Sequence, residues 1–488
     1  MRSTLSKLAG FTLAALGLAA CDDADSTSPT TTTAATTSAS TTTTTDGPLP
    51  GPAEWNREVT PPDAAEAAAK RAACEYKVGS LPAETQGAGT PSGKDIPVEH
   101  ILVMMMENRS FDHYFQKLPE YGQPDVEVAP ADFSNKDNEG NPVTIHHDTS
   151  YCFVDTNHGW GGTHTQVGGG KMDGFFATND GNHEVPVNGS LEMISGKRAL
   201  GYYDETDLPF YYWLANTFSI ADHYHSSVLG PTFPNRMYLY AASSLGLTYN
   251  TIASTENTIV DHLEKREVDW KIYATGTPGI GLFVTTLLKY SDDHLRSIDD
   301  YFADAAAGTL PRFAFIDPNI GREGPINDDE HPPSMAPIGQ RLVAEVVDAL
   351  TKSPNWKDSA LFLTYDEHGG LYDHVVPPKA CPPDDIPTKY EQGPEVGFDQ
   401  YGIRVPMMVV SPYAKKHFVS HKTYDHTSIV RFVEAKFVMP ALSGRDANAE
   451  APWEMFDFDN PPHAEPPAIT IPVLDQSKMD ECEAIFEP

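Results

Sequence analysis

Basic residues are scarce in this chain. Its 488 residues include 34 Lys and Arg against 69 Asp and Glu, so the formal net charge is −35. A surface of that charge repels polyanions, which excludes nucleic acid as a general partner. An anionic substrate is not excluded, because a bound metal ion and a few arginines can dominate the potential inside a pocket.

The N-terminal region lacks an apolar run long enough for a comfortable membrane span. The run over residues 8–20 follows Arg2 and Lys7 and has the length and flanks of a signal peptide. It ends in Leu-Ala-Ala-Cys, so residues 1–21 resemble a bacterial lipoprotein signal in which Cys21 receives the lipid. The alternative is an ordinary secretory signal cleaved near Cys21. Both predict export, and the first predicts a membrane-anchored lipoprotein that faces the periplasm or the cell surface.

Cysteine is also scarce, with five in the whole chain. If Cys21 carries a lipid, four remain in an oxidising compartment, which predicts two disulfides. The sequence alone allows three pairings. We expect Cys74 with Cys482, which would tie both ends of the folded part, and Cys152 with Cys381, which would tie two loops near the site. No pair has the spacing of a zinc site.

Large apolar residues are missing from the stretch that follows the signal. Ser26 to Thr45 are almost all Ser, Thr and Ala, so nothing there drives collapse, and we predict a tether over residues 22–60. Residues 61–95 are predicted to form an N-terminal helix, capped by Asp63, and a linker. The catalytic domain is predicted over residues 96–450. Residues 451–488 are rich in proline and acid and are expected to form an irregular strap anchored by Cys482.

Apolar runs alternate with helical patterns from about Val98 onward, and no internal repeat is visible. Strands are predicted over Ile101–Met106, Trp270–Ala274, Phe313–Ile316, Ala360–Tyr365 and Val405–Val410. Helices are predicted over Thr258–Glu267, Ile338–Thr351 and Ser428–Phe437. In the second of these helices the apolar residues fall on one face. The alternation predicts an α/β sandwich with a central, mostly parallel sheet flanked by helices.

Two groups of oxygen ligands directly follow two of the predicted strands: Glu107-Asn108 and Asp366-Glu367. Ligand sites in such sheets lie beyond the carboxyl ends of the strands, so these side chains are expected to converge. Converging carboxylates need a positive partner, usually a divalent metal ion. Taken alone, each segment also fits a capped or tight turn. Oxygen ligands favour Ca or Mg, although Zn tolerates part of the set.

Thr232 lies in a stretch, Leu-Gly-Pro-Thr-Phe-Pro-Asn-Arg, in which prolines fix the backbone on both sides. We place it near a helix N-terminus, where free amides and partial positive charge favour an anion or alkoxide. This makes Thr232 a candidate nucleophile. The alternative is a plain helix N-cap. Arg236, one turn on, is expected to pair with a carboxylate or to steady a phosphate.

The chain has 18 histidines, most of which must be structural. We single out His158, His331 and His374 because they lie in loops framed by glycine or proline. An imidazole can donate to phosphoryl oxygens or protonate a leaving alkoxide, which suits ester hydrolysis. His426 is instead predicted to belong to a helix start.

Five separated strings, in order, carry a resemblance over roughly Ile96 to Phe437. They are MENRSFDHYF, GGGKMDGFF, LGPTFPNR, DEHPP and TYDEHGGLYDHV. They resemble the bacterial phospholipase C and acid phosphatase family, a branch of the alkaline phosphatase and sulfatase superfamily. The resemblance implies an alkaline-phosphatase-like fold and one metal ion held by Glu107, Asn108, Asp366 and Glu367. It further implies that Thr232 is both ligand and nucleophile, with His158, His331 and His374 around the phosphoryl group.

The sequence therefore predicts a metal-assisted phosphoesterase that works through a phospho-threonine intermediate, with Asn108 and the histidines stabilising the phosphoryl oxygens. Its substrate would be a phosphate monoester or diester, phospholipids included. One alternative is a phospholipase C that acts on phosphodiesters such as phosphatidylcholine. A second alternative is a catalytically inactive surface lipoprotein, which the presence of every expected ligand disfavours.

Overall fold

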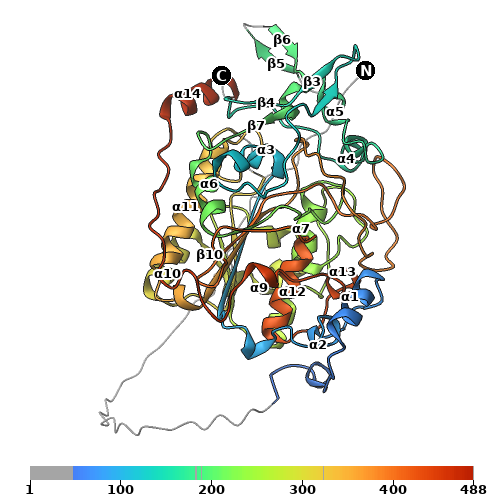
Figure 1. Ribbon diagram of the computed structural model, residues 1–488, viewed down its shortest axis with the longest axis vertical. Helices are drawn as coiled ribbons and strands as arrows, with labels where there is room; N and C mark the ends of the chain where they lie inside the picture. The colour runs from blue at the N-terminus through green and yellow to red at the C-terminus, as the bar shows by residue number, and fades with distance from the viewer. Residues whose placement is uncertain (1–47, 182–183, 188–189, 322–323, 487–488) are drawn as a thin grey trace, which may run out of the picture. The chain divides into compact units, whose positions relative to one another are not determined.

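The computed structural model of the protein describes residues 48–181, 184–187, 190–321 and 324–486 (Figure 1). The predicted signal peptide, Cys21 and most of the predicted tether lie outside these residues. Every element described below lies in the unit that begins at Pro48. In the part of the chain that is described, no helix combines the length and apolarity needed to cross a membrane.

The strands and helices alternate along most of the chain. The strands are β1 His100–Met106, β2 Ser134–Lys136, β3 Pro142–Thr144, β4 His146–His147, β5 Glu184–Val187, β6 Ser190–Met193, β7 Gly201–Tyr202, β8 Ser219–Ala221, β9 Trp270–Ala274, β10 Leu295–Ser297, β11 Phe313–Asp317, β12 Ser359–Tyr365, β13 Met407–Val410 and β14 Phe418–Ser420. The helices are α1 Ala64–Ala72, α2 Pro82–Thr85, α3 Phe111–Phe115, α4 Trp160–Val167, α5 Phe175–Asn179, α6 Pro209–Thr217, α7 Thr232–Ala241, α8 Ile259–Lys265, α9 Val284–His294, α10 Ile298–Ala307, α11 Ala336–Lys352, α12 His426–Phe437, α13 Gly444–Ala447 and α14 Gln476–Phe486.

The core is an eight-stranded sheet in the order β10-β9-β11-β1-β12-β13-β8-β14. Only the pairs β12·β13 and β13·β8 are antiparallel, so β13 alone runs against the others. β1 lies between β11 and β12, parallel to both. Every residue of β11 and β12 is buried, which explains why these strands are apolar throughout rather than alternating. The predicted α/β architecture with a mostly parallel central sheet is confirmed.

Helices cover the sheet in two groups. α7 packs against α8 and α12, and α11 packs against α6 and α10. Figure 1 shows the two groups on either side of the sheet. The stripe of apolar residues on α11 is buried, including Leu342, Val346 and Leu350, as the sequence pattern predicts. His426 opens α12 as predicted, with Asp425 as its cap.

The segment before β1 packs on the domain. α1 begins after Asp63, whose carboxylate accepts the amide of Ala65, so the predicted cap is confirmed. Residues 48–60 belong to the predicted tether, yet Trp55 among them is buried and its carbonyl accepts from Arg266. This end of the tether region is therefore anchored by an aromatic side chain.

The expected disulfide pairing is wrong. The bonds join Cys74 with Cys381 and Cys152 with Cys482, with Cα–Cα distances of 5.5 and 5.6 Å. The end of α1 lies beside the loop that carries Cys381, while α14 brings Cys482 back to the loop of Cys152. Lys478 of α14 lies 4.0 Å from the ring centroid of Tyr151 and shows the same return. Sequence separation carried no information on this proximity.

The C-terminal strap is only partly irregular. The structure confirms an extended, proline-rich course through most of residues 451–475 and the anchor at Cys482. It differs in ending in α14, a helix of 11 residues in which Cys482 is the buried residue. Acidic side chains at its exposed positions left no helical pattern that could be recognised in the sequence.

Candidate active site

The two predicted ligand groups meet at the carboxyl end of the sheet. β1 and β12 are adjacent, and their last residues, Met106 and Tyr365, are register partners. The Asp366 amide donates to the Met106 carbonyl at 3.2 Å, and the Asn108 amide donates to Asp366 Oδ1 at 3.1 Å. Residues that are 258 positions apart are thus hydrogen-bonded, and the expected convergence is confirmed.

Two glycines allow this close approach. Gly369 and Gly370 have φ of +66° and +72°, a conformation that L side chains rarely adopt. A Cβ on Gly369 would lie 2.3 Å from the Asn108 carbonyl oxygen, and one on Gly370 would lie 2.6 Å from the Asn157 carbonyl oxygen. Asn108 itself has φ of +58°. The turn after β12 therefore has to be Gly-Gly for the backbone carrying Asn108 to fit beside it.

Helix α7 supplies a buried arginine to the same place. Arg236 Nε donates to Asp366 Oδ2 at 3.1 Å, and Nη2 lies 3.3 Å from Glu107 Oε1. Nη2 also donates to the carbonyls of Met105 and Met106. Arg236 thus pairs with carboxylates, one of the two roles expected for it, and fixes the first turn of α7 against the ends of β1 and β12.

Thr232 is the first residue of α7, one turn before Arg236 and on the same face of the helix. The residue in the cap position is Pro231, and no side chain caps this helix N-terminus. The plain N-cap role for Thr232 is therefore wrong. Thr232 is 5% exposed, and its hydroxyl makes no hydrogen bond with any residue in the described ranges. A nearly buried hydroxyl without a partner is free to react.

We call Glu107, Asn108, Asp366, Glu367 and Arg236 the site cluster. Three of its buried oxygens, Glu107 Oε1, Asn108 Oδ1 and Glu367 Oε1, have no hydrogen-bond partner. Burial, which is only partly offset by Arg236 for Glu107 and by His158 for Glu367, raises the pKa of both carboxyl groups. Leaving such acceptors buried and unsatisfied costs free energy that a cation would recover. The donor set, all oxygen, fits a divalent metal ion.

His158 and His331 lie beside the site cluster. Their rings are 5.4 Å apart, and each Nδ1 contacts a backbone carbonyl at 2.7 Å, that of Thr156 and that of Pro332. These contacts assign the proton to Nδ1 in the neutral ring and turn Nε2 toward the site. His158 Nε2 lies 3.4 Å from Asn108 Nδ2 and 3.9 Å from Glu367 Oε1.

Asp155 lies between the two imidazoles and was not identified from the sequence. Its Oδ1 lies 3.5 Å from His158 Nδ1 and 4.0 Å from His331 Nε2, and the three residues form a candidate metal-ligand group. Burial lowers the pKa of both histidines, but neighbouring carboxylates, Glu367 and Asp155 for His158 and Asp155 and Glu107 for His331, outweigh it and raise both. No spacing pattern marks Asp155, because its role arises only when separate loops meet.

His374 belongs to a different group. Its Nδ1 lies 2.6 Å from Asp112 Oδ2 and 3.3 Å from Arg404 Nη2, and its Nε2 lies 3.5 Å from Glu127. Arg404 also pairs with Asp112 and Asp373 at 2.8 and 2.9 Å. We call Asp112, Asp373, His374 and Arg404 the Arg404 cluster. The contacts of His374 within it do not include any member of the site cluster, so the structure does not join His374 to the predicted ligands.

Other groups of potential ligands are already engaged. In the Arg404 cluster, the guanidinium already supplies the positive charge that a metal ion would bring. In the group His147, Asp204 and Asp207, Asp207 is buried and both of its oxygens are bonded, one to His147 at 2.6 Å and one to Tyr151 at 2.8 Å. Of the candidate ligand groups in the described ranges, the one formed by Asp155, His158 and His331 is therefore the one that adjoins the site cluster, through His158.

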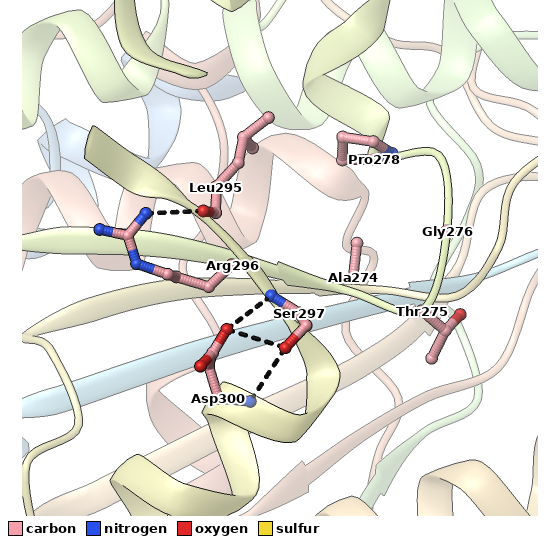
Figure 2. A pocket seen from close by; sticks show the side chains of 8 residues that line it. All are labelled: Ala274, Thr275, Gly276, Pro278, Leu295, Arg296, Ser297 and Asp300. Carbon is pink, nitrogen blue, oxygen red and sulfur yellow. Dashed lines mark hydrogen bonds between the residues drawn. The ribbon is translucent and has the colours of Figure 1, made fainter. Parts of the chain in front are cut away.

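Figure 2 shows a hollow at the ends of β9 and β10, two strands away from the site cluster. Its charged side chains are engaged locally. Asp300 accepts from the amide and hydroxyl of Ser297 and so caps α10, while Arg296 donates to the carbonyls of Leu295 and Asp292. These bonds account for the polar groups there without a ligand.

Comparisons with known proteins agree with this geometry. Residues 98–440 match the phosphoesterase family. Phospholipase C B of Mycobacterium tuberculosis is 29% identical over 466 residues, covering 83% of this chain and 86% of that protein. Non-specific phospholipase C1 of Arabidopsis thaliana is 30% identical over 431 residues, covering 81% and 77%.

Among solved structures, a protein in the alkaline phosphatase superfamily from Vibrio parahaemolyticus matches 76% of this chain and 93% of its own with a TM-score of 0.34 and 9% identity. That likeness is too weak to carry an argument. The family match, by contrast, spans the whole sheet from β1 through α12 and includes every member of the site cluster. The chain therefore belongs to the phosphoesterase family, and it is a hydrolase that acts on phosphoester bonds.

Proposed function

We propose that the protein is a metal-dependent phosphoesterase of the phospholipase C type, with Thr232 as its nucleophile. The observation that carries this proposal is the group of three buried oxygens without a hydrogen-bond partner at the carboxyl end of β1 and β12, which Arg236 joins to the first turn of α7, where Thr232 lies. Buried acceptors without partners are rare in folded proteins and call for an explanation. A cation and a phosphoester together provide one.

Glu107, Asn108, Asp366 and Glu367 would hold one divalent metal ion, with Thr232 as a further ligand. Oxygen donors alone favour calcium or magnesium over zinc. When bound, the ion would lower the pKa of a coordinated hydroxyl and offset negative charge on the phosphoryl group. The excess of carboxylates over arginine in the site cluster leaves room for that positive charge.

The chain's own residues then carry out the reaction. The Thr232 hydroxyl passes its proton to solvent, Oγ1 attacks phosphorus in line, and the bond to the leaving alkoxide breaks. Asn108 Nδ2 and the Nε2–H groups of His158 and His331 in their protonated form, which the raised pKa of each favours, donate to phosphoryl oxygens or to the leaving oxygen. Water then hydrolyses the phospho-threonine. Two in-line displacements give net retention of configuration at phosphorus.

Thr232→Ala tests this assignment. We expect turnover to fall by about a thousandfold or more, because the covalent route is lost, while thermal stability stays within about 0.5 kcal/mol. Thr232→Ser keeps the hydroxyl and serves as the matched control. A variant without the hydroxyl that hydrolyses ester at the wild-type rate would eliminate Thr232 as nucleophile, whatever the substrate.

The substrate is proposed to be a phospholipid. The names of the two relatives described above support this choice, and both proteins match more than 80% of this chain. Parallel assays with phosphatidylcholine vesicles and p-nitrophenyl phosphate separate a phosphodiesterase from a monoesterase. Faster turnover of the phospholipid is the expected result, and hydrolysis of the monoester alone would assign an acid phosphatase activity instead.

Export and lipid attachment at Cys21 are also proposed, on the sequence of residues 1–21. Mass spectrometry of the mature N-terminus tests both. A diacylglyceryl group on Cys21 is the expected product. A free N-terminus near that position would instead indicate an ordinary secretory signal.

A further inference from the structure

Glu330 is a fully buried carboxylate that the proposed reaction does not use. It lies in the loop between β11 and α11. Three buried tyrosines donate to it: Tyr211 Oη to Oε1 at 2.5 Å, and Tyr114 Oη and Tyr365 Oη to Oε2 at 2.5 and 2.7 Å. We call Glu330 and these three tyrosines the Glu330 cluster. With a donor on each oxygen, the buried side chain is held in one position.

The Glu330 cluster connects separate parts of the chain near the site. Two of its tyrosines come from the helices α3 and α6. Tyr365 ends β12 and directly precedes Asp366 of the site cluster. Glu330 itself directly precedes His331. The carboxylate therefore ties the loop of His331 to the strand end that carries a predicted metal ligand.

The backbone at Glu330 is held as firmly as the side chain. Its φ is +73°, a conformation that L side chains rarely adopt and that persists only where surrounding contacts impose it. The Glu330 carbonyl accepts from Arg109 Nε at 2.9 Å and from Nη2 at 2.5 Å. One residue earlier, the Asp329 carbonyl accepts the amide of Glu107 at 3.0 Å. These bonds set the direction in which the chain enters His331.

Helix α11 makes room for the Glu330 side chain. A Cβ on Gly339 of this helix would lie 2.2 Å from Glu330 Cγ. Glycine inside a helix is unfavourable relative to alanine. Its presence at this position is explained by the space that Glu330 needs.

We infer that Glu330 is a positioning residue for His331: its carboxylate, held by three tyrosine hydroxyls, fixes the backbone from which the imidazole reaches the phosphoryl group. A proton donor acts only within hydrogen-bond reach of its acceptor, and a displacement of about 1 Å can cost about 100-fold in rate. The inference rests on the proposed function, in which His331 donates to the substrate. A purely structural Glu330 cluster would support the fold without acting through His331.

The first test is a double-mutant cycle. Glu330→Gln keeps the volume but replaces one acceptor oxygen with an NH₂ group, so kcat should fall by about 10- to 100-fold while KM changes by less than about threefold. In the His331→Gln protein the same substitution should change kcat by less than about threefold, because the positioned residue is gone. Equal losses in both backgrounds would overturn the inference. So would a His331→Gln protein with wild-type kcat.

A pair of tyrosine variants separates positioning from stability. Tyr365→Phe removes one hydroxyl from the Glu330 cluster. Tyr301→Phe, on α10, is the matched control, because this buried tyrosine donates to the Val346 carbonyl at 2.8 Å and lies outside the cluster. Both should lower the melting temperature by similar amounts, since each loses one buried hydrogen bond. Only Tyr365→Phe should lower kcat, by at least about threefold. The same kcat in both variants would contradict the inference.

The second test needs no turnover. Orthovanadate, which mimics the phosphoryl group during transfer, is titrated calorimetrically into the protein as isolated and into its Glu330→Gln form, each with and without His331→Gln. Binding that Glu330→Gln weakens at least about threefold only when His331 is present supports the inference. Equal weakening in both backgrounds, or no binding to any form, contradicts it. If wild-type protein hydrolyses no phosphoester, the proposed function fails, and the titration still decides whether Glu330 acts through His331.

Discussion

The site cluster and the Arg404 cluster arise from the same two stretches of sequence but differ in charge balance. Each combines a residue group after β1 with one after β12, and each contains a fully buried arginine. The site cluster sets three carboxylates against Arg236 and leaves three oxygens without partners. In the Arg404 cluster, two carboxylates face Arg404 and His374, and none of these four residues has an unpartnered buried atom. The two clusters therefore differ in whether buried oxygens are left for a further ligand.

The largest effect is expected from Arg404→Met, which removes the cation of the balanced cluster. Asp112 and Asp373 would stay buried without their main partner, so the free energy of unfolding should fall by about 3–5 kcal/mol. Urea denaturation measures this loss. Arg341→Met is the control, because its ion pair with Glu345 is exposed and should be worth less than about 1 kcal/mol. Equal effects of the two substitutions would refute a special role for the Arg404 cluster.

Metal removal should act on the site cluster alone. Dialysis against a chelator is expected to abolish turnover. It should also lower the free energy of unfolding by about 2.7 kcal/mol relative to protein in metal at about 100 times the Kd. Differential scanning calorimetry with and without added calcium or magnesium measures the shift. Glu367→Gln, which weakens the ligand set, should show a smaller response to metal. If the melting temperature of the wild-type protein does not change when either ion is added, the assigned cation site is contradicted.

Glu367→Gln should also make the metal-free protein more stable, by about 1 kcal/mol, because it removes a buried charge that His158 compensates only in part. Burial raises the pKa of Glu367, so folding in the metal-free state is penalised once the pH exceeds the unfolded value of about 4.3. The gain should therefore be present at neutral pH and absent near pH 4. A variant less stable than wild type at pH 7 would show that Glu367 is already balanced.

The smallest effect is expected from His374→Gln. Burial lowers the pKa of His374, but Asp112 and Asp373 outweigh it and raise the pKa overall. The stability from the charged imidazole is thus complete below about pH 6.5 and is lost as the pH rises through the folded pKa. Denaturation at about pH 6 and pH 9 should show a larger deficit at pH 6. If kcat of the His374→Gln variant falls by orders of magnitude while its stability is unchanged, His374 has a catalytic role instead.

The sequence predicted those parts of the fold that strong local patterns encode. Continuous apolar runs identified β1, β9, β11 and β12, whereas β8, β10 and β14 span three residues each and leave no periodicity to detect. The position of Glu107 and Asp366 followed from a general rule about strand ends. It needed no knowledge of neighbouring loops.

Features that depend on how loops return could not be predicted. The actual disulfide partners of Cys74 and Cys152 lie 307 and 330 residues away, and only the fold decides which cysteines meet. Asp155 acquires its role from two histidines on different loops. His374 was predicted to lie beside the phosphoryl group, whereas its buried partner is Arg404, which lies 30 positions downstream and has no local signal.

The Gly369-Gly370 turn, wedged against the backbone at Asn108 and Asn157, also bears on how this enzyme could diversify. A side chain at either position would collide with main-chain atoms that cannot rotate away. The turn after β12 and the segment after β1 therefore cannot change independently in sequence. Residues 385–392, farther along the connection between β12 and β13, are almost all exposed and carry no such restraint. Substitutions there should leave the turn and the fold intact.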